Sequence, residues 1–221
     1  MTSKNDNPQI STEGAGALLL DAAEATFSAA VQERVWAVAA AMRSLEGVQQ
    51  TVPGMNNLMV VFDPLAAAPE TMRQALASCW RQTVPGATGG REFEIPVRYG
   101  GMEGEDLEVL ARHADLTVQE VVALHTGASY SVAAVGAMPG FVYLSGLDPR
   151  LAMPRRAVPR MRVGIGSVII GGSQAGIMPV TAPSGWHIIG RTDVVLFDAF
   201  REPPAAFRPG DHIRFRAEQV P

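Results

Sequence analysis

The apolar positions in the first third of the chain follow a strand period and then a helical one. A short apolar run from Leu18 to Leu20 predicts a first strand. Two β-rich runs, at 48–52 and 58–62, flank the turn pair Pro53-Gly54 and predict a hairpin. Between the first strand and the hairpin, apolar residues recur at spacings of three and four and predict a long amphipathic helix. These residues are Phe27, Val31, Val35, Val38, Met42 and Leu45.

A second helix and a further strand follow the hairpin. Pro69 occupies a position where the first turn of a helix tolerates proline, and Met72 and Leu76 begin an apolar helical face. Apolar and polar residues alternate over 93–97, which predicts a half-exposed final strand. The order β-α-β-β-α-β predicts a ferredoxin-like α+β domain over 15–98, preceded by a flexible tail over residues 1–14.

Two short helices are predicted in the segment 99–129, at 105–113 and 118–125. The second begins with Thr117 and Glu120 at the spacing of a capping box, in which side chains satisfy the open amides of the first turn. We interpret this segment as a helical connector between two domains.

The pattern changes after Tyr130, because short apolar runs alternate with Gly and Pro clusters and no helical period is sustained. An all-β barrel domain is therefore predicted over 130–221. Its expected strands are 131–135, 167–170, 186–190, 194–197 and 212–216.

Composition and charge narrow the functional classes. The first fourteen residues lack the apolar core of a secretory signal, and the longest apolar stretch is far shorter than the roughly 20 residues of a membrane span. The single cysteine, Cys79, fits a buried thiol in a reducing compartment, so we expect a cytoplasmic protein. The formal net charge of −4 argues against nucleic acid as a partner.

The charge is unevenly distributed along the chain. Residues 1–125 hold 8 basic and 16 acidic residues, whereas residues 126–221 hold 10 basic and 6 acidic ones. Five arginines lie between Arg150 and Arg162, a density that favours a nearby anionic group, although a solvated loop explains it equally simply.

Familiar catalytic motifs are incomplete in this sequence. The only lysine is Lys4, so the chain has no Walker A loop, and Gly164-Ile-Gly166 lacks the rest of a dinucleotide fingerprint. Ala175 replaces the second glycine of a nucleophile elbow in 171–176. The four histidines are scattered without a metal-binding spacing, so no metal site is predicted.

Two residues keep both a structural and a functional interpretation. His125 falls at the end of a predicted helix, where a helix C-terminus favours a protonated ring, and this role is as plausible as a catalytic one. Trp186 suits a pocket wall and a barrel core about equally. The surrounding segment 136–191 is rich in Gly and Pro and poor in titratable groups, which suits a pre-formed ligand or partner surface.

The second half of the sequence resembles a family known under three names: the B subunit of 5-oxoprolinase, allophanate hydrolase subunit 1, and sporulation histidine kinase inhibitor. The N-terminal part resembles it more loosely, through 16–20, 52–54 and 60–64. The residues that carry the stronger resemblance are 97–101, 106–108, 116–122, His125, 138–144, 146–151, 154–156, 159–160, 166–168, 174–177, 184–186, 189–192 and 209–211.

This resemblance implies a ferredoxin-like domain followed by a cyclophilin-like β-barrel. It also implies that the chain works with a C subunit, which is sometimes fused to it, and with a separate A subunit. Together they would hydrolyse 5-oxoproline to glutamate with ATP, which is used at the level of the complex. The implied catalytic residues are His125 and Gln174. The candidates for binding the substrate or a phosphoryl group are Phe141, Arg155, Arg156, Arg160, Trp186 and Arg191.

The sequence departs from the usual family pattern at Ala137, Val142, Ser145 and Met178. These positions fall in the expected pocket, so a different small amide substrate stays open. Three further alternatives also stay open: one chain of an allophanate hydrolase or urea carboxylase, a non-catalytic kinase inhibitor, and a two-domain protein whose glycines are purely structural.

Overall fold

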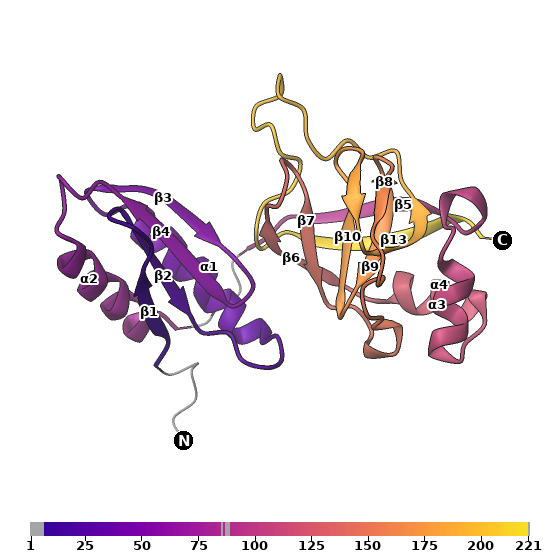
Figure 1. The fold of residues 1–221 in the computed structure, drawn as a ribbon, viewed down its shortest axis with the longest axis horizontal. Coiled ribbons are helices and arrows are strands. Elements are labelled where there is room, and N and C mark those ends of the chain that lie inside the picture. Colours follow the sequence, from indigo (N-terminus) through magenta and orange to yellow (C-terminus); the bar gives the residue numbers. More distant parts are fainter. Residues whose placement is uncertain (1–6, 85, 87–88, 221) are drawn as a thin grey trace. The chain divides into compact units, whose positions relative to one another are not determined.

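The structure is a computed structural model that describes residues 7–84, 86 and 89–220 (Figure 1). The chain divides into two compact units, residues 1–89 and 90–221. Among the described residues, no helix has both the length and the apolar character needed to cross a membrane.

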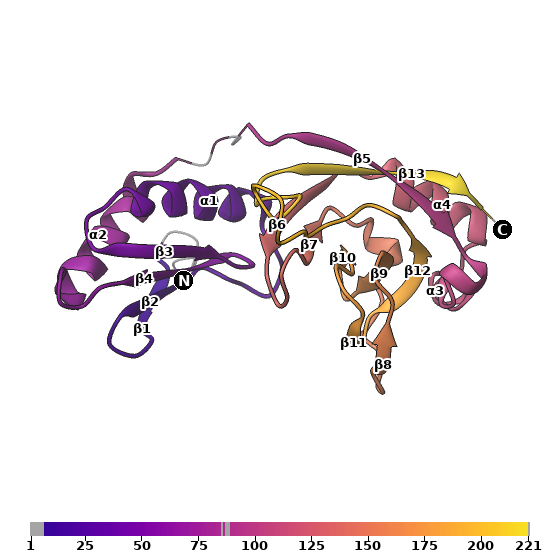
Figure 2. The same ribbon diagram turned by 90° about the horizontal axis from the view of Figure 1, so that it is seen from above.

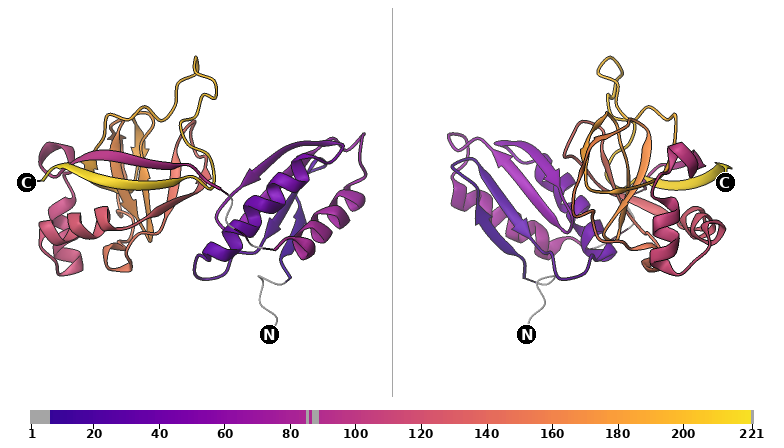
Figure 3. Two further views of the ribbon diagram at one scale, coloured as in Figure 1. Left: turned by 180° about the vertical axis from the view of Figure 1, so that it is seen from behind. Right: turned by 45° about the vertical axis from the view of Figure 1, so that its right-hand side comes forward.

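The first unit is a four-stranded antiparallel sheet in the order β1-β2-β4-β3, with two helices packed on one face (Figure 3). Its elements are β1 (Gln9–Thr12), β2 (Ala17–Asp21), α1 (Ala29–Arg43), β3 (Val48–Pro53), β4 (Asn57–Phe62) and α2 (Pro69–Gln82).

Local sequence explains most of this unit. Leu58, Val60 and Phe62 alternate along β4 and are at most 2% exposed, so one face of the strand lies in the core. Gln32 of α1 reaches the hairpin between β3 and β4, where its side-chain oxygen accepts a hydrogen bond from the Asn56 amide at 2.7 Å. This buried pair ties the helix to the turn, in which Asn56 has a φ of 56°.

The predicted order of two helices and three strands is confirmed for this unit, but its fourth strand is a different one. β1 pairs with β2 at the sheet edge, so residues 9–12 are not part of a tail, whereas residues 1–6 lie outside the described residues. The strand expected at 93–97 belongs to the second unit, so the predicted boundary at residue 98 is wrong. The ferredoxin-like description of this unit stays an interpretation.

The second unit is a closed seven-stranded barrel in the order β10-β7-β6-β13-β5-β12-β9, accompanied by a separate two-stranded sheet (Figures 1 and 2). The barrel strands are β5 (Glu92–Tyr99), β6 (Tyr130–Val135), β7 (Val142–Ser145), β9 (Ser167–Gly171), β10 (Gln174–Ile177), β12 (His187–Arg191) and β13 (His212–Gln219). The two-stranded sheet consists of β8 (Arg160–Val163) and β11 (Ala182–Ser184). Short 3-10 helices lie at Gly101–Glu103 and Pro149–Leu151.

Long-range pairing places β5 in the barrel. The strand runs parallel to β13, with Phe93 opposite Ile213 and Ile95 opposite Phe215, and its far end pairs with β12. The alternation that predicted a strand is therefore correct, but alternation cannot name the partner strand. Without β5 the barrel would be open between β13 and β12.

The two helices between β5 and β6 are α3 (Leu107–Ala114) and α4 (Val118–Gly127). Leu110 and Val121 are fully buried and share one core with the barrel strands. Because the strands before and after the helices both belong to the barrel, the helices are an insertion in it and do not connect two domains. The capping box of Thr117 and Glu120 is present at the start of α4.

Four of the five strands expected beyond residue 130 are present. The exception is 194–197, where only Phe197 forms an isolated bridge, with Ala205. The strands that were not predicted, β7, β8, β10 and β11, are three or four residues long, too short for a reliable period.

His125 lies in the core between α4 and the barrel and has no solvent exposure. Its Nδ1 lies 2.7 Å from the hydroxyl of Tyr99, and its ring stacks on Phe215 with centroids 4.5 Å apart. Among the described residues its Nε2 has no hydrogen-bond partner. Burial lowers the pKa of His125 to about 3, so the folded protein holds this ring neutral.

This burial predicts a pH-dependent stability. Below about pH 6.5 the unfolded chain protonates His125 while the folded chain does not, so stability falls as the pH falls. The single residue should cost about 2 kcal/mol between roughly pH 6.5 and pH 5. Urea unfolding across this range should give a shallower pH slope for His125→Phe than for the parent protein. His113→Gln, at an exposed position, should keep the parent slope, and equal slopes for all three proteins would contradict the prediction.

Candidate functional site

A pocket of about 240 Å³ lies on the second unit, outside the barrel core. Phe141, Tyr143 and Trp186 pack edge to face in its wall, with ring centroids 4.9 to 6.1 Å apart. The complete lining is Ala137, Met138, Phe141, Tyr143, Arg155, Met178, Pro183, Ser184, Gly185 and Trp186. Aromatic rings and thioether groups form one wall, beside polar surface that includes Arg155 and Ser184, so the pocket offers a small flat ligand both apolar and polar contacts.

Two glycines make room for the aromatic wall. A Cβ on Gly171 would lie 2.5 Å from the Trp186 ring, and a Cβ on Gly176 would lie 3.0 Å from the ring of Phe141. These glycines belong to the paired strands β9 and β10, so the tryptophan lies directly against sheet backbone. The close approach explains why this glycine-rich segment has no side chains at these points.

The positive charge of the pocket comes from Arg155. Its guanidinium lies over the Trp186 ring, 5.6 Å from the centroid. No ion pair to Arg155 is found within the part of the chain that the structure describes. The pocket therefore presents an aromatic wall and a cation that is available to a ligand carboxylate or phosphate.

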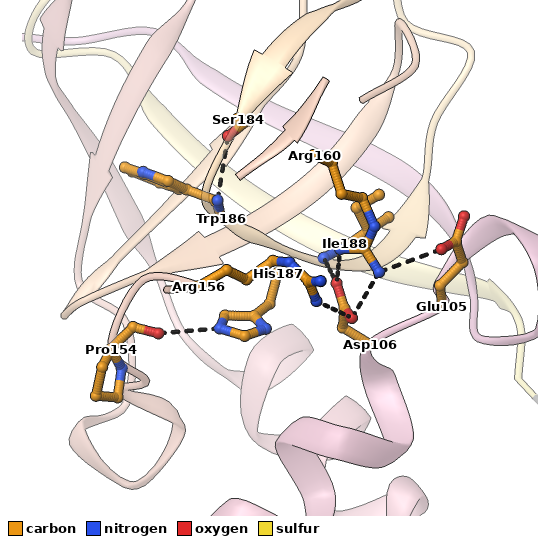
Figure 4. A network of polar contacts seen from close by, with 9 residues as sticks. All are labelled: Glu105, Asp106, Pro154, Arg156, Arg160, Ser184, Trp186, His187 and Ile188. Carbon is orange, nitrogen blue, oxygen red and sulfur yellow. Dashed lines mark hydrogen bonds and ion pairs between the residues drawn. The ribbon is translucent and has the colours of Figure 1, made fainter. Parts of the chain in front are cut away.

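The loop that carries Arg155 is held by Asp106, which is 2% exposed (Figure 4). Its carboxylate accepts hydrogen bonds from both terminal nitrogens of Arg160, at 2.6 and 2.9 Å, and from the Ile188 amide at 2.8 Å. Arg156 adds a contact at 3.3 Å. Burial alone would raise the pKa of Asp106, but the hydrogen bonds from Arg160 and Ile188 outweigh it and hold that pKa below its usual value.

Two further hydrogen bonds fix the same loop on either side of Arg155. The Arg156 amide donates to the Gly185 carbonyl at 2.7 Å. Nε2 of His187 lies 2.9 Å from the Pro154 carbonyl oxygen, as Figure 4 shows. The backbone around Arg155 is thus anchored to β12 and to the segment that lines the pocket.

The structure brings together three of the candidate residues and separates the others. Phe141, Arg155 and Trp186 line the pocket. Gln174 begins β10 and is half-buried, outside the lining, and Arg191 is exposed at the end of β12.

The remaining candidates have other surroundings. Arg156 and Arg160 pair with Asp106, so the four arginines considered for a phosphoryl group do not form one cluster. His125 lies in the core described above, and its ring does not reach the pocket.

Sequence reasoning missed several residues of this region. Tyr143 stands two positions after Phe141, and the period of a strand could have placed both on the same face. Asp106 lies in a segment of the family resemblance, 106–108, but its role was not predicted, since its partners are 50 or more positions away. Of the four departures from the family pattern, Ala137 and Met178 line the pocket.

Comparison with known proteins gives consistent results. The family described as carboxyltransferase domain, subdomain C and D, matches residues 8–207. The B subunit of 5-oxoprolinase from Escherichia coli O157:H7 is 41% identical over 193 residues, which cover 87% of this chain and 88% of that protein. Its namesake from Haemophilus influenzae is 38% identical over 86% of this chain and 88% of that protein.

Solved structures agree with the fold. The crystal structure of TTHA0988 is similar with a TM-score of 0.80 and 34% identity over 93% of this chain, which spans only 40% of that longer chain. The urea amidolyase of K. lactis also has a TM-score of 0.80, over 99% of this chain and 15% of that one, but at 17% identity this shows the fold alone. The chain therefore belongs to the family of the carboxyltransferase domain, subdomain C and D, and is a homologue of the two 5-oxoprolinase B subunits.

Proposed function

We propose that this chain is the B subunit of a cytoplasmic, ATP-dependent 5-oxoprolinase that hydrolyses 5-oxoproline to glutamate together with its A and C subunits. The observation that carries the proposal is the 41% identity with the E. coli protein over 88% of its length. A relative of this similarity and coverage has the same architecture throughout, so a shared role is the simplest account.

The pocket chemistry is consistent with this substrate. 5-Oxoproline is a flat five-membered lactam that carries one carboxylate. Its ring would lie against the aromatic wall of Tyr143 and Trp186, and its carboxylate would pair with the guanidinium of Arg155. A planar fork suits a carboxylate better than a point charge does.

The pocket does not supply a complete set of reacting groups. None of its described lining residues is Asp, Glu, His, Lys or Cys, so a general base for the attacking water has to come from elsewhere. His125 is unsuited because its neutral ring is fully buried. ATP and the acid-base groups are therefore assigned to the complex, and this chain to holding the amide substrate.

A urea-type carboxyltransferase role is the second candidate, since the family description and the urea amidolyase fold both suggest it. It is weaker because that structural likeness has 17% identity. A single reconstitution separates the two roles. Purified chain is mixed with ATP and with the A and C subunits of the same source, and either 5-oxoproline or urea with bicarbonate is supplied.

The first prediction is that 5-oxoproline yields glutamate and ADP, and that omission of this chain reduces glutamate release to background. The measurement is chromatographic separation of radiolabelled 5-oxoproline and glutamate. Full activity without this chain, or turnover of urea alone, would overturn the proposal.

The second prediction concerns the pocket cation. Arg155→Ala should raise the KM for 5-oxoproline by about 10- to 100-fold with little change in kcat, because a charge-assisted hydrogen bond to the bound carboxylate is lost. Arg155→Lys should recover part of the loss. Arg214→Ala, at an exposed arginine of β13 outside the pocket, serves as the matched control and should leave KM unchanged. An unchanged KM in Arg155→Ala would remove this residue from the substrate site.

The third prediction concerns Asp106, which holds the loop of Arg155. Asp106→Asn should lower the free energy of unfolding by about 3 kcal/mol, because Arg160 loses its buried charged partner and keeps only the exposed Glu105 among the described residues. Asp193→Asn removes an exposed partner of Arg98 and should cost less than about 1 kcal/mol. Urea unfolding of both variants tests the comparison, and equal losses would show that burial of Asp106 is not decisive.

A further inference from the structure

The two strands β8 and β11 form a ribbon that stands apart from the barrel (Figure 2). Val163 pairs with Ala182, and Arg160 pairs with Ser184. We use the term ribbon for residues 158–166 and 180–184. One end of the ribbon is closed by hydrogen bonds from the Ile165 amide to Thr181 Oγ1 at 3.3 Å and from the Gly166 amide to the Met178 carbonyl at 2.8 Å.

The ribbon exposes apolar side chains that the core of the unit leaves uncovered. Val158 is 76% exposed, Met161 77%, Ile165 47% and Val180 42%. Ile165 and Val180 lie at the same closed end, since their neighbours Thr181 and Gly166 make the hydrogen bonds just described. Isolated exposed apolar residues are ordinary, but four on one small ribbon form a candidate contact surface.

The ribbon is also a wall of the pocket. Pro183 and Ser184 of β11, with the adjoining Gly185, belong to the pocket lining. A polypeptide that covered the ribbon would therefore lie at the pocket mouth, next to Arg155.

The charge of residues 149–192, which include the ribbon and much of the pocket lining, indicates what kind of partner surface would bind there. Residues 149–192 contain six arginines and no Asp or Glu. Asp106 and Glu105 neutralise part of that charge through Arg156 and Arg160, and Asp148 pairs with Arg150, whereas the described residues provide no ion pair for Arg155 or Arg162. A complementary surface would be apolar at its centre and acidic at its rim; methionine and arginine are both enriched in such interfaces.

We propose that the ribbon docks a companion polypeptide with an apolar, acid-rimmed surface, and that docking closes the pocket over its ligand. This chain matches only part of TTHA0988. The proposed occupant of the ribbon is a separate protein, from the same source as this chain, that matches the remaining, larger part of TTHA0988. In TTHA0988 a unit similar to this chain is covalently joined to that larger part, since the match covers only 40% of it. The closure step rests on the proposed function, whereas docking itself does not.

The test measures the dissociation constant of the full-length companion by titration calorimetry. Met161→Asp and Val180→Asp each place a carboxylate in the apolar centre and should weaken binding by about 100-fold, the size of an interface hot spot. Arg162→Glu should weaken it and flatten its salt dependence. Leu65→Asp and Phe200→Asp alter apolar residues outside the ribbon that are even more exposed, at 96% and 101%, and these variants should bind as the parent does. Circular dichroism and thermal melting identify any variant that fails to fold.

Three outcomes would overturn docking at the ribbon: no binding of the companion by the parent chain, parent-like affinity in both Met161→Asp and Val180→Asp, or loss of binding only in Phe200→Asp. Closure is tested separately by equilibrium dialysis of radiolabelled 5-oxoproline with and without the companion, which should tighten binding by at least about tenfold. Unchanged affinity overturns closure. If 5-oxoproline binds in neither case while the ribbon variants lose the companion, docking stands and the proposed function fails.

Discussion

The carboxylate of Asp106 joins parts of the second unit that are far apart in sequence. Asp106 directly precedes α3, and its carboxylate accepts a hydrogen bond from the amide of Ile188 in β12. The carboxylate also pairs with Arg156, which lies before β8, and with Arg160, which begins β8. A buried carboxylate is tolerated only when its charge is matched and its lone pairs are satisfied, and both conditions are met here. One side chain therefore links the ribbon, the loop of Arg155 and β12, in addition to the hydrogen bonds of Arg156 with Gly185 and of His187 with Pro154.

The shape of the pocket depends on packing as much as on charge. Trp186 lies against Gly171, and Phe141 against Gly176, so the strands β9 and β10 approach the aromatic rings without intervening side chains. The cation above the tryptophan then has a defined position because its loop is anchored on both sides. The ion pairs of Asp106 and the glycines beside the aromatic rings together produce a pre-formed pocket surface. Fewer side chains then have to become ordered when a ligand binds.

Local elements of this fold could be predicted from the sequence, whereas long-range pairings could not. The helix 29–43 and the hairpin after it follow from periodicity and from Pro53-Gly54. The strand at 92–99 was recognised but assigned to the first unit, because its partner β13 lies about 120 positions later. For the site, the motif segments led to Phe141 and Trp186, but the network of Asp106 depends on partners that no local pattern identifies.

The ion pairs of Asp106 also determine which arginine side chains remain available to a ligand or a partner. A segment with six arginines and no acidic residue would repel itself if all its charges were unpaired. Asp106 lies outside that segment and pairs with Arg160 and Arg156 inside the fold. Arg150 pairs with Asp148 and Arg191 is exposed at the end of β12, so Arg155 remains at the pocket and Arg162 on the ribbon. The buried carboxylate of Asp106 thus holds the loop beside the pocket and keeps Arg156 and Arg160 in the structure of the fold, whereas Arg155 and Arg162 can contact a ligand or a partner.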